Sequence, residues 1–560
     1  MDKIHDTPVA SASDVVGFVS CPHLTELDLA VAEGKLQPPV QTDEMMEMLR
    51  ERGLDHERAH LEHYEANGAV VVDVELSDRG AAGRSSPAAR ERRLAELAAA
   101  TVDAMRQGVD VIYQAAFFDR SGRIWWRGHA DFLRKVDQST GLGGWGYEPE
   151  DTKLSTHASA WAALQLSFYA DLVTLTQQSA VRSIHIVLGS GEPVSLRTDE
   201  FGAYFRMVRA HFERAVLGRE SSYPLPNAHC RVCRWAARCH QRWENDDHLV
   251  RVANLSVEQA KKLQAAGIPT LTDLAVSPPT ISVPGIGQET MRRLQQQARL
   301  QHAAIPGEPP PWEFVEPFEE EMGLASLPAP DPGDVFYDIE GHPYAASGGL
   351  EYLHGLEWLE RGAPKFEGWW AFDENEERFV FERIIDFIVQ RRKRFPNMHV
   401  YHYAPYEVTA LKRLMSKYGT REQEMDELLR AEVFVDLYRV VRHGVRVGTS
   451  SYSIKRLEPL YMPARDDEIG DGGSSIVAFE RWLQTRNQQI LDDILAYNTD
   501  DVVSNRMLRS WLEDRRSEAV LLGLPAARPQ ATADASKPTD PELAALIAQL
   551  NLDRRGGDLL

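Results

Sequence analysis

The four cysteines of this chain constrain its fold more than any other feature. Cys21 stands near the N-terminus, whereas Cys230, Cys233 and Cys239 form a C-x2-C-x5-C group much later. Clustered cysteines in a reducing compartment more often bind metal than pair as disulfides. Four thiolates can share one metal site only if the fold brings both ends of the segment together. We therefore expect the cysteines to close a single domain around the residues between them.

Composition indicates a soluble protein of several domains. A chain of 560 residues corresponds to roughly three or four domains. No apolar stretch approaches the ~20 residues that span a bilayer, and the N-terminus lacks a signal-peptide pattern. We expect a cytoplasmic location and no membrane association. The net charge of −22 disfavours a broadly basic nucleic-acid surface, but it does not exclude a nuclease, since metal sites need clustered carboxylates.

The chain divides by composition into an α/β multi-domain arrangement. A proline-rich stretch indicates one linker, and alternating strand and helix patterns indicate a later α/β domain. The C-terminal residues have the polar composition of a mostly disordered tail. The expected regions are a first domain at 1–247, a small helical module at 250–304, a linker at 305–333, a second α/β domain at 334–520 and the tail at 521–560.

The first domain carries a candidate phosphodiesterase site. Asp131 lies on the second arm of an expected hairpin, and Asp151-Thr152-Lys153 lies on a short strand-like segment. Carboxylates are hard ligands that suit Mg²⁺ or Mn²⁺, and His56 on an expected helix is a further metal ligand. Lys153 lies two residues after Asp151, on the same side of the strand, where it can orient water or offset charge.

The order of these motifs resembles the RecB-like nucleases of the PD-(D/E)xK type. The chain reads His56, then Gly128-x-x-Asp131, Asp151-x-Lys153 and Gln165-x-x-x-Tyr169, the last pair sharing one helix face. Cysteines placed one before and three after the motifs resemble the iron–sulfur subgroup that includes the AddB-type nucleases. This resemblance implies a 4Fe-4S cluster that locks the ends of the domain together. Spacing alone leaves a structural Zn²⁺ site as the alternative, because four thiolates suit both.

The middle module has a turn that contains Gly285 and Gly287 and precedes a helix with Arg292 and Arg293. A glycine turn at a helix N-terminus presents backbone N–H groups that suit a phosphate. The module resembles a helix-hairpin-helix, which implies sequence-independent binding of the DNA backbone. The alternative is a packing adaptor between the domains, and the two roles are compatible.

The second α/β domain carries another set of acidic residues. Asp338 and Glu340 lie two apart on an apolar strand and therefore share one face. Tyr497 and Asp501 lie four apart on a helix. These motifs resemble DnaQ-like, ribonuclease H-like exonucleases of the DEDDy type, especially the YprB-type branch. The resemblance implies that the three acids bind divalent metal and that the tyrosine orients the attacking water.

The middle acid of this second set departs from the family pattern. Glu407 stands where the family usually has an aspartate, and its longer side chain puts the metal geometry in question. Asp436, which follows an apolar strand, is the other acid near this position.

These patterns predict a metal-dependent nuclease that acts on DNA in repair, processing or defence. Trimming from 3′ to 5′ is what the resemblance implies for the second site. RNA is an alternative substrate, and the other alternative is a nucleic-acid-binding scaffold with one or both sites degenerate. The chain contains no G-x-x-x-x-G-K-[ST] loop for ATP, so a helicase, where one takes part, would be a separate partner.

Overall fold

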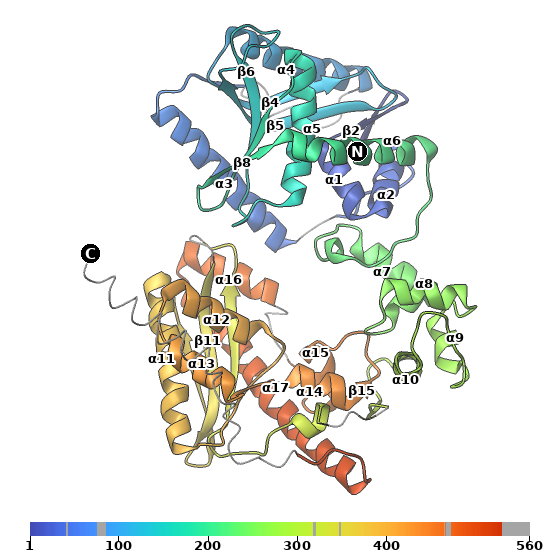
Figure 1. The fold of residues 1–560 in the computed structure, drawn as a ribbon, viewed down its shortest axis with the longest axis vertical. Coiled ribbons are helices and arrows are strands. Elements are labelled where there is room, and N and C mark those ends of the chain that lie inside the picture. The colour runs from blue at the N-terminus through green and yellow to red at the C-terminus, as the bar shows by residue number, and fades with distance from the viewer. Residues whose placement is uncertain are drawn as a thin grey trace, which may run out of the picture.

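The computed structural model of this chain describes residues 1–40, 43–74, 86–316, 318, 321–345, 349–463, 465 and 472–528. Three lobes follow one another along the chain (Figure 1). No described helix combines the length and apolar character needed to cross a membrane. Most of the expected disordered tail, from residue 529 on, lies outside the described residues.

A mixed sheet forms the centre of the first lobe. Its main path runs β1-β2-β5-β6-β7-β8, and β4 pairs with both β3 and β5. The expected hairpin is present, because β4 and β5 pair antiparallel, and β6 pairs antiparallel with β5. The strands are β1 (Asp2–Ile4), β2 (Thr7–Ala10), β3 (Val71–Asp73), β4 (Val111–Asp119), β5 (Trp125–Val136), β6 (Gly146–Thr152), β7 (Ser183–Val187) and β8 (Pro193–Arg197).

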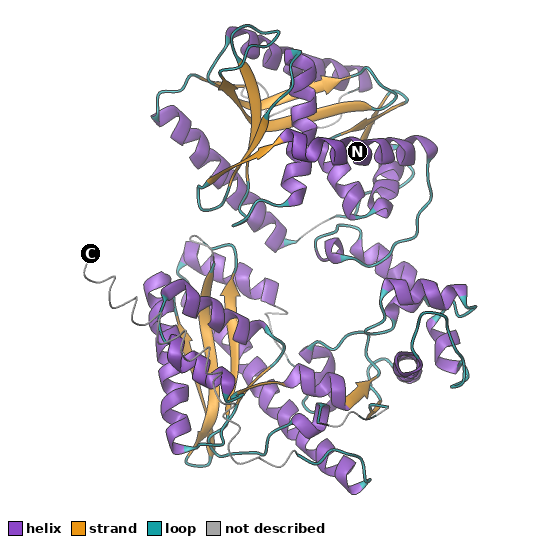
Figure 2. Ribbon diagram, viewed as in Figure 1, coloured by secondary structure: helices purple, strands orange, loops and turns teal. Residues whose placement is uncertain are grey.

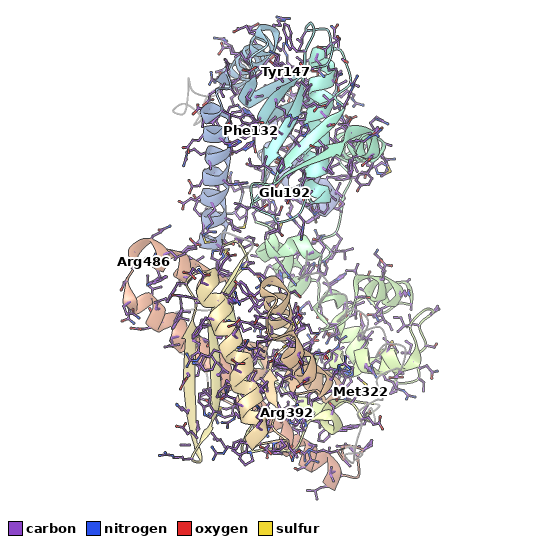
Figure 3. The ribbon with its side chains drawn as sticks, turned by 60° about the vertical axis from the view of Figure 1, so that its left-hand side comes forward. Phe132, Tyr147, Glu192, Met322, Arg392 and Arg486 are labelled. Atoms are coloured by element: carbon purple, nitrogen blue, oxygen red, sulfur yellow. The ribbon has the colours of Figure 1, made fainter. Side chains whose placement is uncertain are left out.

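Helices cover this sheet and bury a large aromatic core. α5 packs on β6 and β7, α4 packs on β4, and α3 contacts β6. Phe132 and Tyr147 are fully buried in this lobe (Figure 3). The helices are α1 (Ala12–Ser20), α2 (Pro22–Ala32), α3 (Glu44–Ala66), α4 (Pro87–Gln107), α5 (Ala160–Gln177), α6 (Thr198–Gly218), η1 (Ala228–Arg231), α7 (Ala236–Asn245) and η2 (Leu249–Arg251).

The middle lobe consists of α8 (Val257–Ala265), α9 (Leu271–Val276) and α10 (Gln288–Ala303). Buried leucine, isoleucine and valine side chains hold the three helices together. The side chain of Gln297 on α10 donates to the carbonyl of Val447 at 2.8 Å, and it also accepts from the hydroxyl of Tyr452 at 2.8 Å. These buried hydrogen bonds attach the module to the third lobe, as the adaptor interpretation requires.

The third lobe is a five-stranded sheet with helices on both sides (Figure 2). Its order is β12-β11-β10-β13-β14, in which β10, β11 and β12 pair antiparallel while β13 and β14 continue parallel to β10. The strands are β10 (Val335–His342), β11 (Leu350–Glu360), β12 (Ala363–Trp370), β13 (Val400–His402) and β14 (Phe434–Asp436). The helices are α11 (Glu374–Arg394), α12 (Tyr406–Tyr418), α13 (Glu422–Arg430), α14 (Leu437–Gly444), α15 (Ile454–Leu457), η4 (Glu458–Leu460), α16 (Gly472–Thr485) and α17 (Gln488–Leu521).

Alternation along β10 decides which residues meet which helices. Val335, Tyr337 and Ile339 enter the core shared with α11, α12 and α13. Phe336 enters the other core, which α14 and α17 help to form. Because side chains alternate on a strand, Asp338 and Glu340 face the α17 side with Phe336. The fold therefore turns both acids of the strand toward the helix that carries Asp501.

The segment at 305–333, expected to be a linker, is packed in its described part. β9 (Trp312–Phe314) pairs antiparallel with β15 (Val445–Val447), and η3 (Gly323–Ser326) contacts α14. Leu324 and Leu327 are fully buried. Although this segment is rich in proline, it contains enough apolar side chains to pack against the third lobe.

The first and third lobes touch through α3 and α16, which approach each other in Figure 1. Arg52 on α3 forms an ion pair with Glu480 on α16, and Arg481 pairs with Glu44 at 3.0 Å. Glu480 also lies 2.6 Å from Nε2 of His342, at the end of β10. A chain of polar contacts thus connects the two α/β lobes.

Candidate functional site

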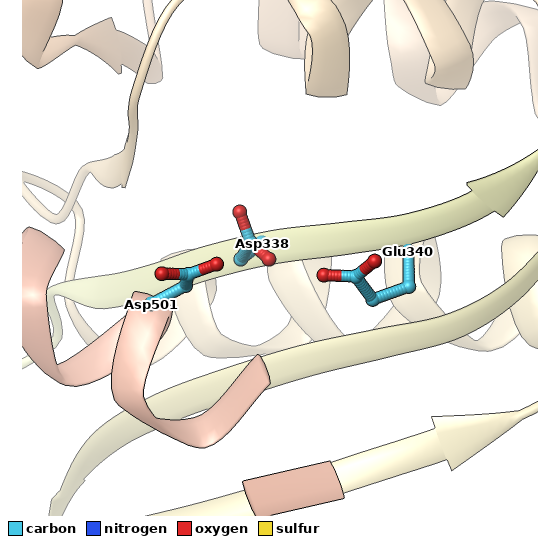
Figure 4. A group of neighbouring side chains, drawn as sticks. All are labelled: Asp338, Glu340 and Asp501. Atoms are coloured by element: carbon cyan, nitrogen blue, oxygen red, sulfur yellow. The ribbon is translucent and has the colours of Figure 1, made fainter. Parts of the chain in front are cut away.

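The densest acidic cluster lies in the third lobe, between β10 and α17. Asp338, Glu340 and Asp501 each offer a carboxylate oxygen, and these oxygens all lie within 4.8 Å of one another. Figure 4 shows the three carboxylates gathered between the strand and the helix. Among the described residues, no other group of three or more histidine, cysteine or acidic side chains meets that limit. The arrangement suits hard divalent cations such as Mg²⁺ or Mn²⁺.

The electrostatics of this cluster fit a cation. Burial, followed by the charge of Asp501, raises the pKa of Glu340 to about 8. Burial likewise raises the pKa of Asp338 well above its usual range, with Asp501, Glu340 and Glu407 adding to the effect. Burial also raises the pKa of Asp501, although the nearby Arg465 opposes it. Buried like charges at this spacing are costly unless a positive ion offsets them.

The sequence-based reasoning missed two residues that support this cluster. Nδ2 of Asn498 on α17 donates to Oδ2 of Asp338 at 2.8 Å and so fixes that carboxylate. Gly355 on β11 leaves space for Asn498, because a Cβ there would lie 1.8 Å from its Oδ1. Asn498 precedes Asp501 by three residues, so helical spacing could have indicated that both share a face.

Tyr497 lies beside the acids, one helical turn before Asp501. Its side chain is only 5% exposed, and burial, with the charge of Asp501, raises the pKa of its hydroxyl far above the usual value. The hydroxyl therefore stays protonated and can donate or accept a hydrogen bond at neutral pH.

The two candidates for the middle acid have different surroundings. Glu407, at the start of α12, lies outside the group of three, and its Oε2 is 3.3 Å from Nδ1 of His402. Burial raises its pKa, and its charge is close enough to raise that of Asp338. Asp436 accepts hydrogen bonds from the backbone N–H groups of Ala404 and Tyr438, both at 2.9 Å. Asp436 thus caps α14, whereas a ligand role for Glu407 stays a prediction.

The first lobe also gathers its predicted acids. Burial and the neighbouring Asp151 raise the pKa of Asp131 well above its usual range. Nζ of Lys153 lies 2.6 Å from Oδ2 of Asp151. Asp151 is 1% exposed, and neither of its carboxylate oxygens has an aligned hydrogen-bond donor. Such a buried carboxylate fits a metal ligand.

Glu57, next to His56 on α3, is a further acid that the sequence-based reasoning missed. It is 8% exposed, accepts a hydrogen bond from Gln114, and adds to the raised pKa of Asp131. Nε2 of His56 lies 3.4 Å from the carbonyl oxygen of Val187. No sequence signal distinguishes Glu57 from His56 as a metal ligand, because both residues belong to one polar stretch of helix.

The Q-x-x-x-Y pair lies against the same sheet. Tyr169 is 6% exposed, and burial, followed by the charge of Asp151, raises its pKa. Gln165, four residues earlier on α5, acts in the opposite direction and lowers the pKa of Tyr169. The G-x-x-D motif has a glycine at position 128 because a Cβ there would lie 2.9 Å from the ring of Tyr169.

The four cysteines line one small cavity of ≈ 20 Å³, although the first is far from the others in sequence. Cys21 stands between α1 and α2, Cys230 is on η1, and Cys239 is on α7. All four are free thiols, and burial, followed by the other three sulfurs, raises the pKa of Cys239 to about 11. No three of these described sulfurs lie within 4.8 Å of one another.

The middle lobe places its predicted residues at one end of α10. Gly285 has a positive φ of 78°, which a turn of this kind needs, and its carbonyl accepts from Nζ of Lys262 at 3.0 Å. Gly287 caps the helix. Arg292 is exposed, whereas Arg293 pairs with Glu289. The turn remains compatible with phosphate binding.

Comparison with known families identifies the class of the third lobe. Residues 335–513 match the family model of the RNase H superfamily. No curated protein matches the chain. The domain that holds Asp338, Glu340 and Asp501 is thus ribonuclease H-like, a class of domain consistent with a nuclease-type hydrolase. The match covers this lobe alone.

Proposed function

We propose that this protein is a metal-dependent nuclease that hydrolyses DNA phosphodiester bonds, with a 3′-to-5′ exonuclease site of the DEDDy type in the third lobe. One observation carries the proposal: Asp338, Glu340 and Asp501 converge beside Tyr497 within a ribonuclease H-like domain. Repair, processing or defence against foreign DNA is the setting that we infer.

The residues divide the work of hydrolysis at this site. Asp338, Glu340 and Asp501 would hold divalent cations, which activate water and neutralise charge on the phosphoryl oxygens when bound. Asn498 keeps Asp338 oriented. Tyr497, protonated and close to Asp501, would position the attacking water. Arg465 lies 2.7 Å from Oδ1 of Asp501 and limits the negative charge of the site before a cation arrives.

We further propose that the first lobe is a RecB-like nuclease with its own metal site. Asp131 and Asp151 are the metal ligands of this proposal, and His56 or Glu57 on α3 completes the set. Lys153, next to Asp151, would offset charge on the scissile phosphate.

Incubation of the full-length protein with labelled oligonucleotides tests the proposed activity. With 5′-labelled single-stranded DNA and Mg²⁺ or Mn²⁺, we expect a ladder of products shortened from the 3′ end, and EDTA should abolish it. RNA of the same sequence, run in parallel, reports the exoribonuclease alternative. Binding without cleavage under every metal condition would instead identify a nucleic-acid-binding scaffold.

The cysteine cavity supports a 4Fe-4S cluster in the first lobe as part of this proposal. The four thiols line one cavity, which brings Cys21 to the three cysteines that follow it much later in the sequence. Such a cluster would connect α1 and α2 to α7 and restrict the ends of the lobe.

Replacing Cys233 with serine should remove the cluster. We expect anaerobically purified wild-type protein to be coloured and to contain iron. Cys233→Ser should lose both colour and iron and unfold its first lobe at lower temperature, because one of four ligands is gone. Val232→Ser, a neighbour that is 48% exposed, is the matched control and should retain iron. Stoichiometric zinc without iron in the wild type would contradict this assignment.

A further inference from the structure

The strand that carries two acids of the third-lobe site ends at His342, two residues after Glu340. The antiparallel pairing of β10 with β11 shifts register between Glu340 and Gly341, as it does at a β-bulge. The regular ladder is therefore interrupted directly after a candidate metal ligand. Contacts from outside the sheet have to fix this last part of β10.

A buried histidine provides one such contact. His342 is fully buried, and its Nε2 lies 2.6 Å from Oε1 of Glu480 on α16. Its Nδ1 accepts a hydrogen bond from the backbone N–H of Tyr344 at 3.2 Å. Both ring nitrogens thus have partners, and Glu480 holds the end of β10 against α16.

An arginine of the first lobe completes this group of contacts. The guanidinium of Arg52 on α3 donates to the carboxylate of Glu480 and to the backbone carbonyl of Tyr344. The side chain of Glu480 is only 10% exposed. A carboxylate at this depth needs a charged partner, so its position depends on Arg52. The same arginine also restrains the turn that follows β10, because it binds the carbonyl of Tyr344.

We propose that Arg52 is a positioning residue of the exonuclease site, which fixes the end of β10 through Glu480 and Tyr344 and so orients Glu340 for metal binding. This inference rests on the proposed function. A residue of the first lobe then completes a site in the third, so the docking of the two lobes and the metal affinity of the site are linked. Residues that orient a metal ligand from behind contribute about 10–100-fold in metal affinity.

The first test measures how 3′ trimming by the full-length protein depends on Mn²⁺ concentration. Arg52→Ala should raise the Mn²⁺ concentration for half-maximal trimming about tenfold, with kcat at saturating Mn²⁺ within about twofold of the wild type. Arg52→Lys should show a smaller shift, because lysine keeps the charge but lacks the fork that reaches two acceptors. Arg50→Ala, whose side chain is 72% exposed on the same helix, is the matched control and should leave this dependence unchanged.

A double-mutant cycle separates positioning from a general loss of stability. Glu480→Gln keeps a hydrogen-bonding side chain beside His342 but removes the charge that Arg52 pairs with. Arg52→Ala should therefore shift the Mn²⁺ requirement much less in the Glu480→Gln background than in the wild type. Equal shifts in the two backgrounds would show that Arg52 does not act through Glu480 and would overturn the proposal.

Mn²⁺ binding without substrate gives a readout that is independent of activity. Calorimetry in the Asp151→Asn background, which removes a proposed ligand of the first lobe, should show about tenfold weaker binding by Arg52→Ala. Unchanged binding, or a lower kcat with an unchanged Mn²⁺ requirement, would overturn the role of Arg52. If the wild type binds Mn²⁺ but does not trim, the exonuclease function is wrong and the binding comparison still decides the role of Arg52. Absence of Mn²⁺ binding would overturn both.

Discussion

Replacing Asp338 with asparagine is expected to lower the rate of 3′ trimming at least about 1000-fold, since a metal-held charge contributes several kcal/mol to the transition state. Asparagine has nearly the same shape and can still accept the hydrogen bond from Asn498, so the change removes the charge alone. Asp492→Asn, an exposed position on α17, is the matched control and should keep full activity.

The same variant should be more stable than the wild type without metal. The folded-state pKa of Asp338 is raised far above the unfolded value, so its ionisation at neutral pH opposes folding. Asparagine removes that penalty, and each kcal/mol gained raises the melting temperature of a domain of this size by about 3 °C. Calorimetry with EDTA and with Mn²⁺ measures both effects, because Mn²⁺ should stabilise the wild type much more than Asp338→Asn. An inactive variant with a lowered melting temperature would contradict the ligand role.

Replacing Asp151 with asparagine should abolish cleavage by the first lobe. In the Asp338→Asn background only the first site can cut, and there Asp151→Asn is expected to reduce the remaining cleavage at least about 100-fold, because a buried metal ligand is lost. Asp137→Asn, exposed just after β5, is the control. Internal cleavage of a circular single strand is the measurement, since an exonuclease cannot act on it.

Equal cleavage by the double and single variants would remove Asp151 from the mechanism. If Asp338→Asn already cuts no circular substrate in Mg²⁺ or Mn²⁺, the first lobe is the degenerate, binding-only unit of the alternative hypothesis.

Several features of the third site could be predicted because they are local. The two-residue spacing of Asp338 and Glu340 on a strand determines that they share a face, and the four-residue spacing of Tyr497 and Asp501 on a helix does the same. The structure contains both elements and brings the three acids together. The family comparison supports the ribonuclease H-like fold of this domain.

Other features escaped prediction because they depend on partners far away in sequence. Asn498 can donate a hydrogen bond to Asp338 only because α17 packs against β10. Lys455 on α15 lies over the ring of Tyr497 on α17, although the two residues are far apart in sequence. The segment expected to be a linker packs against the third lobe because Leu324 and Leu327 are buried in its core.

The sequence by itself determined which side chains share a face, since strand and helix periodicities follow from the backbone alone. It also determined the order of the acidic motifs and the spacing of the four cysteines. Only the tertiary structure decided how far apart the carboxylates and sulfurs lie and how deeply each is buried. The physical reason is that pKa, metal fit and catalytic contact depend on distances and dielectric surroundings, which arise when separate elements pack together.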